Sequence, residues 1–252
     1  MYLSKLTWLE ARTALNADTI VVLPLGAAAK EHGPHLKLEN DRILADYLTD
    51  RIVREESVVV APTLTYHFYP AFTAYPGSTS LRLETARDMV IDIVSSLAAF
   101  GPRRFYVLNT GVSTVRALEP AAASLATGGI LMHYTRIDRA GSAAVREVQQ
   151  QPGGSHADEI ETSMMLYIDA DCVDMNEAVN DYHPGKGPLT PHRDSPGVYS
   201  PSGVYGDATL ASTDKGRVVV EATVRDLLRD IAALRVCPLP PNTPDNTSER
   251  SD

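Results

Sequence analysis

The residues best suited to chemistry lie in one short segment, residues 30–41, where histidines and carboxylates follow each other closely. His32 supplies an imidazole, and Asp41, nine residues later, supplies a carboxylate at the start of an amphipathic stretch. Imidazole and carboxylate together are typical ligands of zinc and other divalent ions. Glu31, beside His32, is a further candidate ligand. The spacing allows a metal site, and a plain helix cap beside a solvated histidine is the competing interpretation.

A second cluster, residues 155–163 (SHADEIETS), combines a histidine with two glutamates. Composition alone favours a helix N-terminus, with Ser155 as the cap and acidic residues in the first turn, where the helix dipole stabilises them. At about 100° per residue, His156 and Glu159 share a helix face, whereas Glu161 points away. Both glutamates can face one pocket only if His156 lies before the first helical turn.

These clusters need a scaffold, and the hydrophobic pattern predicts one of alternating strands and helices. Such alternation favours an α/β fold with a largely parallel sheet covered by helices on both faces. In such sheets, ligands bind beyond the carboxyl ends of the strands, where loops follow the predicted strands. The expected strands are residues 19–25, 57–64, 104–108 and 129–137, and the expected helices are residues 41–55, 84–100, 115–126, 157–169 and 214–236.

Loops between these elements carry further polar and aromatic residues. Residues 66–81 are rich in Tyr, Pro, Gly and Ser, and their aromatic side chains suit a substrate pocket, a subunit contact or core packing. Residues 182–207 form an unusually long connection, and such length indicates a functional loop. From these loops and their neighbours we predict five substrate contacts: His35, His67, Tyr75, Asn109 and Ser113.

Bulk properties exclude several classes of protein. The chain has 252 residues, 44% of them apolar, and a net charge of −9, which argues against nucleic acid or an anionic membrane as partner. No apolar run reaches the roughly 18 residues of a membrane span, and no secretory signal is evident. We expect a cytoplasmic protein with one domain over residues 1–237 and a disordered, Pro-rich tail over residues 238–252.

Beyond these patterns, the sequence resembles the creatininase family in four stretches that occur in the family's order. The two most specific are residues 31–41, where EHGPHL is followed by Asp41, and residues 156–164, which begin HAD and continue ETSM. Residues 76–81 (PGSTSL) and 202–207 (SGVYGD) support them. The resemblance therefore covers most of the chain.

The resemblance implies a three-layer α/β/α fold, a homo-oligomer that is often a hexamer, and a divalent metal centre that hydrolyses C–N bonds of amides. Family members act on cyclic ureas such as creatinine, on formamides and on a modified precursor peptide. Carried over by residue, it implies His32 as a metal ligand and Asp41 as a carboxylate that bridges two metals. It further implies His156 as a catalytic acid/base and Glu161 as a carboxylate bound to the metal.

The chain departs from the family pattern at two places. The family has Glu where this chain has Lys30, and it has an Asn-Gly-His stretch where this chain has NTG at residues 109–111. Ligands usual for one of the metals are therefore missing or displaced. Three arrangements remain open: one ion held by His32, Asp41 and a glutamate; Glu31 moved into the lost ligand's place; or the Lys30 ammonium neutralising Asp41 without a metal.

We therefore predict a metal-dependent amidohydrolase that cleaves a C–N bond of a small cyclic amide, a formamide or a modified peptide. We expect one ion rather than two, with zinc ahead of manganese or iron. In this mechanism Glu159 or Glu31 accepts a proton from water, and His156 protonates the leaving nitrogen. The alternatives are a lyase or isomerase that uses Lys30 as base or Schiff-base nucleophile, and a binding protein on the same scaffold. The candidate metal ligands are Glu31, His32, Asp41 and Glu161, and the candidate catalytic residues are Lys30, His156 and Glu159.

Overall fold

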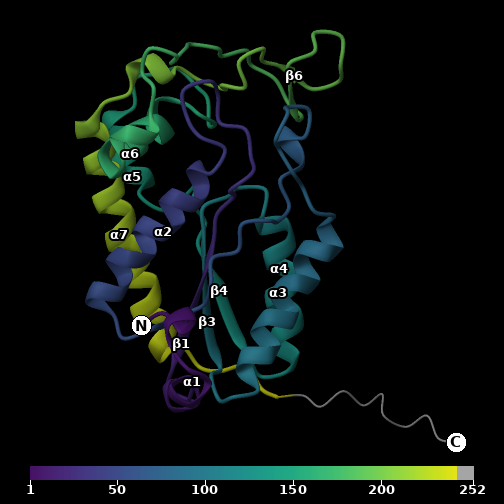
Figure 1. The fold of residues 1–252 in the computed structure, drawn as a ribbon, viewed down its shortest axis with the longest axis vertical. Coiled ribbons are helices and arrows are strands. Elements are labelled where there is room, and N and C mark those ends of the chain that lie inside the picture. Colours follow the sequence, from purple (N-terminus) through teal and green to yellow (C-terminus); the bar gives the residue numbers. More distant parts are fainter. Residues whose placement is uncertain (243–252) are drawn as a thin grey trace, which may run out of the picture.

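Strands and helices alternate along the chain, as the sequence predicts (Figure 1). The structure is a computed structural model, and it describes residues 1–242. Four parallel strands form the central sheet in the order β2-β1-β3-β4. Every residue of β1 is buried, as expected for a central strand of a parallel sheet. The strands are β1 (Ile20–Leu25), β2 (Val59–Val60), β3 (Arg104–Asn109) and β4 (Leu131–Tyr134).

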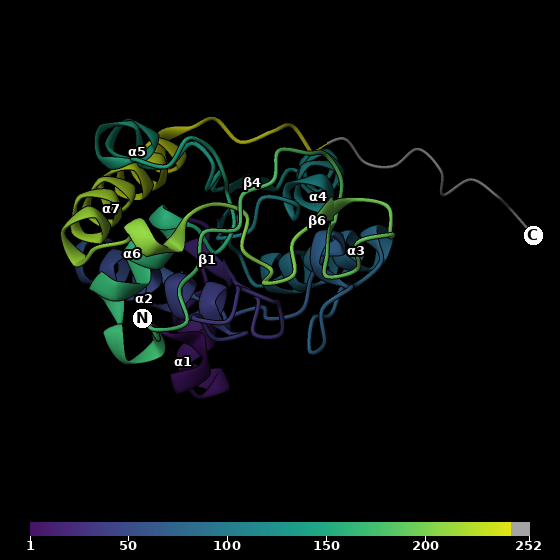
Figure 2. The ribbon, with the colours of Figure 1, turned by 90° about the horizontal axis from the view of Figure 1, so that it is seen from above.

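Helices cover both faces of this sheet, which confirms the predicted three-layer α/β/α fold (Figures 1 and 2). One face carries α2 (Asn40–Glu55), α6 (Glu159–Ile168) and α7 (Thr213–Val236), and the other carries α3 (Leu83–Ala98) and α4 (Val115–Thr127). Along β1, Ile20 belongs to the core shared with α2 and α7, whereas Val21 belongs to the core shared with α3 and α4. Two separate apolar cores therefore hold the three layers together.

The structure differs from the prediction mainly in short elements. The run predicted as a strand over residues 57–64 forms a continuous strand only at β2 and pairs again at Leu64, and Pro62 between them lacks the N–H that an unbroken ladder would need. Two short helices, α1 (Trp8–Ala14) and α5 (Ser142–Val148), were not expected. A capping box between Thr7 and Glu10 begins α1, which shows that local hydrogen bonds define this helix more than an apolar stripe does.

Loops gather at the carboxyl end of the sheet, at the top of Figure 1. Residues 182–207, predicted as a functional loop, contain a small parallel pair, β5 (Leu189–Thr190) and β6 (Val198–Tyr199). Tyr75 of the aromatic loop packs against Leu189 and Val198. The two irregular loops therefore support each other over this end of the sheet.

The C-terminal segment was predicted to be a disordered tail from residue 238. Of that segment, Asn242 forms a bridge with Gly128, and residues 243–252 lie outside the described residues. The extent of the domain, residues 1–237, stays a prediction. Within residues 1–242, none of the helices combines the length and the apolar character that crossing a membrane requires.

Candidate metal centre

The two clusters identified in the sequence meet beyond the carboxyl end of β1. His32 lies in the loop that follows β1, and Asp41 lies in the first turn of α2. From the other side, Glu161 lies in the first turn of α6, and His156 lies just before that helix. Both histidines and Asp41 are buried, and Glu161 exposes 18% of its side chain. The fold thus places two imidazoles and two carboxylates in one buried site.

The start of α6 decides which of its acidic residues reaches this site. Asp158 caps the helix, because its carboxylate accepts two free N–H groups of the first turn at 3.0 Å. This corrects the expected cap, Ser155, and moves the helix start along the chain. The carboxylate of Glu161 then turns back to accept the N–H of Ala157 at 2.6 Å. Ala157 has a left-handed backbone (φ +48°), and the turn it makes places His156 beside Glu161.

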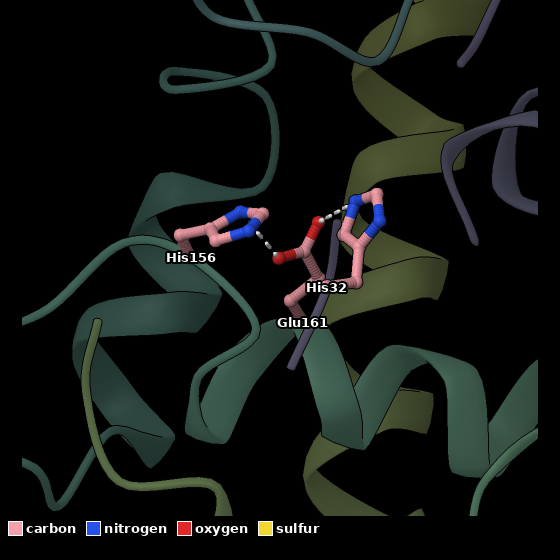
Figure 3. Close-up of side chains that lie close together, drawn as sticks. All are labelled: His32, His156 and Glu161. Carbon is pink, nitrogen blue, oxygen red and sulfur yellow. Dashed lines mark ion pairs between the residues drawn. The ribbon is translucent and has the colours of Figure 1, made fainter. Parts of the chain in front are cut away.

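His32, His156 and Glu161 have the spacing of a metal-binding set (Figure 3). One potential ligand atom from each lies within 4.8 Å of the others. Oε1 of Glu161 lies 3.6 Å from Nε2 of His32, and Oε2 lies 3.7 Å from Nδ1 of His156. Two ligands at about 2.0–2.1 Å from a tetrahedral zinc ion lie roughly 3.4 Å apart, so these separations fit an ion held between the three side chains.

Hydrogen bonds place a proton on one ring nitrogen of each histidine. Nδ1 of His32 lies 2.9 Å from the carbonyl oxygen of Lys30, which only accepts, so Nδ1 carries the proton. Nε2 of His156 lies 2.9 Å from the carbonyl oxygen of Glu31 and 3.1 Å from its carboxylate, so Nε2 carries the proton there. Nδ1 of His156 is therefore unprotonated and faces Glu161, whereas Nε2 of His32 faces both Glu161 and Asp41. An outward N–H bond to a carbonyl or carboxylate is the usual arrangement of a metal-binding histidine.

Asp41, predicted as a ligand that bridges two metals, is shared between His32 and Lys30. Its Oδ1 lies 2.9 Å from Nε2 of His32, and its Oδ2 lies 2.6 Å from Nζ of Lys30. Burial alone would raise the pKa of Asp41, but the Lys30 ammonium and His32 outweigh that effect and hold the pKa well below its usual range. Nε2 of His32 can bind a metal ion only through its lone pair, so metal binding would replace its contact with Asp41.

Lys30, predicted as a base or a Schiff-base nucleophile, forms a buried ion pair instead. Its side chain is 7% exposed, and its Nζ contacts the carboxylate of Asp41. In such a pair lysine is an ammonium, which has no lone pair to accept a proton or attack a carbonyl. The geometry therefore opposes the nucleophilic role and makes Lys30 the counter-charge of Asp41.

Glu31, predicted as a metal ligand, supports His156 rather than joining the ligand set. Its carboxylate accepts the N–H of Gly33 and lies 3.1 Å from Nε2 of His156. Gly203, at φ +84°, packs directly against that carboxylate, and a Cβ at this position would overlap it. The surrounding chain thus holds Glu31 on the far side of His156 from Glu161.

Glu159, predicted as a catalytic base, lies outside the site. Its carboxylate has no exposed surface and accepts the N–H groups of Gln150 and Gln151. It also pairs with Nζ of Lys215 at 2.5 Å. Because both oxygens are engaged away from the histidines, the structure corrects this prediction, and Glu159 ties the α5–α6 connection to α7.

Of the five predicted substrate contacts, Ser113 is the one that lines the cavity beside the site. Asn109 is fully buried, and its amide oxygen accepts bonds from the N–H of Gly111 and the hydroxyl of Thr114. Its amide nitrogen donates to the carbonyl oxygen of Gly111 at 2.7 Å. Asn109 thus closes the turn after β3 and does not line the cavity, so its predicted contact with substrate stays a prediction.

The remaining three predicted contacts are packed into the interior and do not line the cavity. Nε2 of His35 lies 2.8 Å from the hydroxyl of Thr162, and the hydroxyl of Tyr75 donates to the carbonyl oxygen of Ser200 at 2.7 Å. Burial lowers the pKa of His35 and the pKa of His67 to about 4 each. His35 and Tyr75 thus connect segments around the site through these hydrogen bonds, and His67 is buried away from the cavity.

A cavity of about 610 Å³ opens beside the ligand set and is lined by Lys30, His156 and Glu161 among others. This volume lies within the usual range of small-molecule sites. Phe72 also lines it; its ring centroid is 4.2 Å from that of His156, and Nζ of Lys30 lies 4.8 Å from the Phe72 ring. Phe72 and Tyr69 line the cavity but were not among the predicted site residues. The aromatic side chains of their loop had suggested a substrate pocket as one of three possibilities.

Comparison with known proteins agrees with this site and fold. The chain matches the family model described as creatinine amidohydrolase over residues 4–231. Creatinine amidohydrolase of Pseudomonas putida is 27% identical over 248 residues, which cover 90% of this chain and 94% of that protein. A mycofactocin precursor peptide peptidase of Mycobacterium ulcerans is 27% identical over 223 residues, 84% of each protein. A solved structure described as creatininase Mn is 26% identical, with a TM-score of 0.79, and covers 94% of this chain and 99% of that one.

The family match, over residues 4–231, covers nearly all of the residues that the structure describes, 1–242. The relatives are named as an amidohydrolase and a peptidase, which bears out the prediction of a hydrolase. The family model spans both segments that supply the site, the loop after β1 and the start of α6. On the agreement of motifs, layered fold and family match, this chain belongs to the creatininase family.

Proposed function

We propose that the protein is a metal-dependent amidohydrolase that cleaves a C–N bond of an amide substrate. The observation that carries the proposal is the convergence of one ring nitrogen from each of two histidines and one carboxylate beside a cavity that His156 and Glu161 line. His32, His156 and Glu161 would hold one divalent ion. Two nitrogens and one oxygen suit zinc best, with manganese or iron as alternatives. When bound, such an ion supplies a Lewis acid and lowers the pKa of water.

In this arrangement His156 acts as a ligand rather than as the acid predicted from the sequence. Glu31 holds the proton of His156 at Nε2 and thereby keeps Nδ1 free. Phe72 packs on the imidazole and fixes its plane. The proposal thus gives Glu31 the role of orienting His156, and it gives Glu159 no proton-accepting role, because its carboxylate is already engaged by backbone N–H groups and a lysine.

The cavity supports a substrate larger than a single small ring. Beyond its polar end at Lys30 and Glu161, it is also lined by Val145, Ile160 and Met164 from α5 and α6. These side chains offer an apolar wall, which stabilises a ligand through burial of its apolar surface. Among the predicted substrate classes, a modified peptide or another amide with an apolar extension therefore fits better than a compact cyclic amide or a formamide.

The oligomeric state, localisation and partners of the protein are also part of the proposed function. We propose a cytoplasmic homo-oligomer, with a hexamer as the expected form, that acts on a small molecule and binds neither nucleic acid nor membrane. The net charge of −9 supports the absence of a polyanionic partner. Sedimentation velocity tests the assembly, since a hexamer has six times the 27.3 kDa mass of one chain.

Metal removal tests the function directly. The purified protein would be analysed for bound metals, stripped with chelator and assayed on a panel of cyclic amides, formamides and peptides. We expect chelation to abolish hydrolysis and zinc or manganese to restore it. Glu161→Gln should weaken metal binding at least tenfold, whereas Glu147→Gln, an exposed carboxylate on α5, should leave it unchanged. Full hydrolysis by the metal-free protein would refute the proposal.

A further inference from the structure

Lys30 is a buried lysine attached to the same site as the proposed ligands. Its Nζ lies 2.6 Å from Oδ2 of Asp41, and the other oxygen of Asp41 lies 2.9 Å from Nε2 of His32. Asp41 therefore presents one oxygen to the proposed ligand set and the other to the ammonium. A carboxylate in this central position could bridge two cations, and one of its two oxygens is already taken by Lys30.

The charges around the two histidines show what the ammonium does. Three carboxylates contact them, from Glu31, Asp41 and Glu161, and Lys30 is the cation that pairs with this group. With neutral imidazoles the group carries a net charge of −2, which a single divalent ion offsets. A second divalent ion would leave a net charge of +2 in a buried site, and an uncompensated buried charge is costly.

Aromatic rings hold the ammonium in place independently of any ion. Nζ of Lys30 lies 4.8 Å from the ring of Phe72 and 5.9 Å from that of Tyr69, within the range of cation–π attraction. The backbone N–H of Lys30 donates to the carbonyl oxygen of Leu38 at 3.1 Å, so the main chain at this position is also fixed. These contacts hold the Lys30 side chain beside Asp41.

We propose that the Lys30 ammonium takes the place of a second metal ion. It neutralises Asp41 and limits each chain to one divalent ion, held by His32, His156 and Glu161. The inference rests on the proposed function, because it requires that these three residues bind an ion. It assigns Lys30 a positioning role, in which the lysine sets the number of ions and keeps Asp41 from bridging two of them.

The test counts the ions and detects coupling between them. Wild-type protein saturated with Mn²⁺ should contain one ion per chain by elemental analysis and give the electron paramagnetic resonance spectrum of an isolated ion. Lys30→Glu removes the ammonium and adds a carboxylate beside Asp41, so it should bind two ions and give the spectrum of an exchange-coupled pair. Lys37→Glu makes the same charge change at an exposed position of the same loop and should keep one ion.

The number of bound ions distinguishes a failure of the role assigned to Lys30 from a failure of the proposed function. Two ions per wild-type chain would overturn the inference and leave the proposed function intact. One ion in a folded Lys30→Glu protein would overturn it as well. A wild-type chain that binds no ion would overturn the proposed function and the inference together. If Lys30→Glu does not fold, the wild-type count and spectrum at saturating Mn²⁺ still decide, because a coupled pair there contradicts the inference.

Discussion

Replacing Glu159 with glutamine separates a structural from a catalytic role for this buried carboxylate. Both of its oxygens are in use, since they accept the N–H groups of Gln150 and Gln151 at 2.7–3.0 Å and pair with Nζ of Lys215 at 2.5 Å. Glutamine has the same shape but a single acceptor oxygen. Its NH2 group would therefore face either the backbone N–H groups or the ammonium, and one set of bonds would be lost.

The expected loss of stability follows from the surroundings of the pair. Removing one partner of a buried ion pair costs about 3–5 kcal/mol, because the remaining charge is left uncompensated. Lys215 keeps two neutral acceptors, Oε1 of Gln150 at 2.8 Å and the carbonyl oxygen of Leu210 at 2.7 Å, and 15% of its side chain is exposed. We therefore expect the lower end, about 3 kcal/mol, or roughly a hundredfold in the unfolding equilibrium.

Urea unfolding of Glu159→Gln measures this loss. The m-value, which is the slope of the free energy of unfolding against urea concentration, should not change. Glu147→Gln on α5 is the control and should change the free energy of unfolding by less than about 0.5 kcal/mol, because Glu147 is exposed. Metal content and hydrolysis per folded molecule should stay as in the wild type. Unchanged stability together with lost hydrolysis would refute the structural role and restore Glu159 as a proton acceptor.

Three further predictions concern the surroundings of the site. Burial lowers the pKa of His67 from 6.5 to about 4. Between pH 6.5 and pH 4 the unfolded chain therefore binds a proton at His67 that the folded chain does not bind. The free energy of unfolding contributed by His67 should therefore fall by up to about 3 kcal/mol as the pH falls from about 6.5 to about 4. His67→Leu should flatten this slope in urea titrations, and an unchanged slope would contradict it. Gly203→Ala places a Cβ at φ +84° into the carboxylate of Glu31, so thermal melting should show a loss of about 1–3 kcal/mol, and a neutral effect would contradict the close packing. Phe72→Leu removes the ring that packs on His156, and calorimetric zinc titration should show several-fold weaker binding with the fold retained; equal affinity would show that the ring does not orient the imidazole.

The layered fold could be predicted because buried parallel strands produce continuous apolar runs. β1 is buried along its whole length. It begins one residue after the predicted start and ends at the predicted residue, Leu25. Short elements could not be predicted in this way. α5 follows Gly141, whose φ is +68° and which offers no side-chain cap, so neither periodicity nor a capping residue marks its start.

The residues that meet at the site could be predicted in part. His32, Asp41, His156 and Glu161 were candidates because of their residue types and their places beyond strand ends and before helices. The orientation of the second cluster depended on its cap: the shift from Ser155 to Asp158 leaves His156 before the helix, so the turn at Ala157 sets where His156 lies relative to Glu161. This shift brings Glu161 toward the histidines and directs Glu159 toward α7.

Contacts that depend on tertiary structure could not be predicted from spacing. The packing of Phe72 on His156 joins loops about eighty residues apart, and no local pattern indicates it. Lys30 was considered both as a nucleophile and as a counter-charge for Asp41, and the sequence could not separate the two. The choice depends on whether a carboxylate lies within ion-pairing distance of Nζ of Lys30 once the chain has folded, and Asp41 does.

Because Asp41 has its counter-charge within the chain, the order in which the protein folds and acquires its ion is not fixed. A buried carboxylate group without an internal ammonium would need its metal during folding, since the unpaired charges would oppose collapse. Here Lys30 travels with the polypeptide and is present from synthesis onward. For Asp41, folding therefore needs no metal ion, and an ion at the proposed site could bind to the folded chain as a separate step.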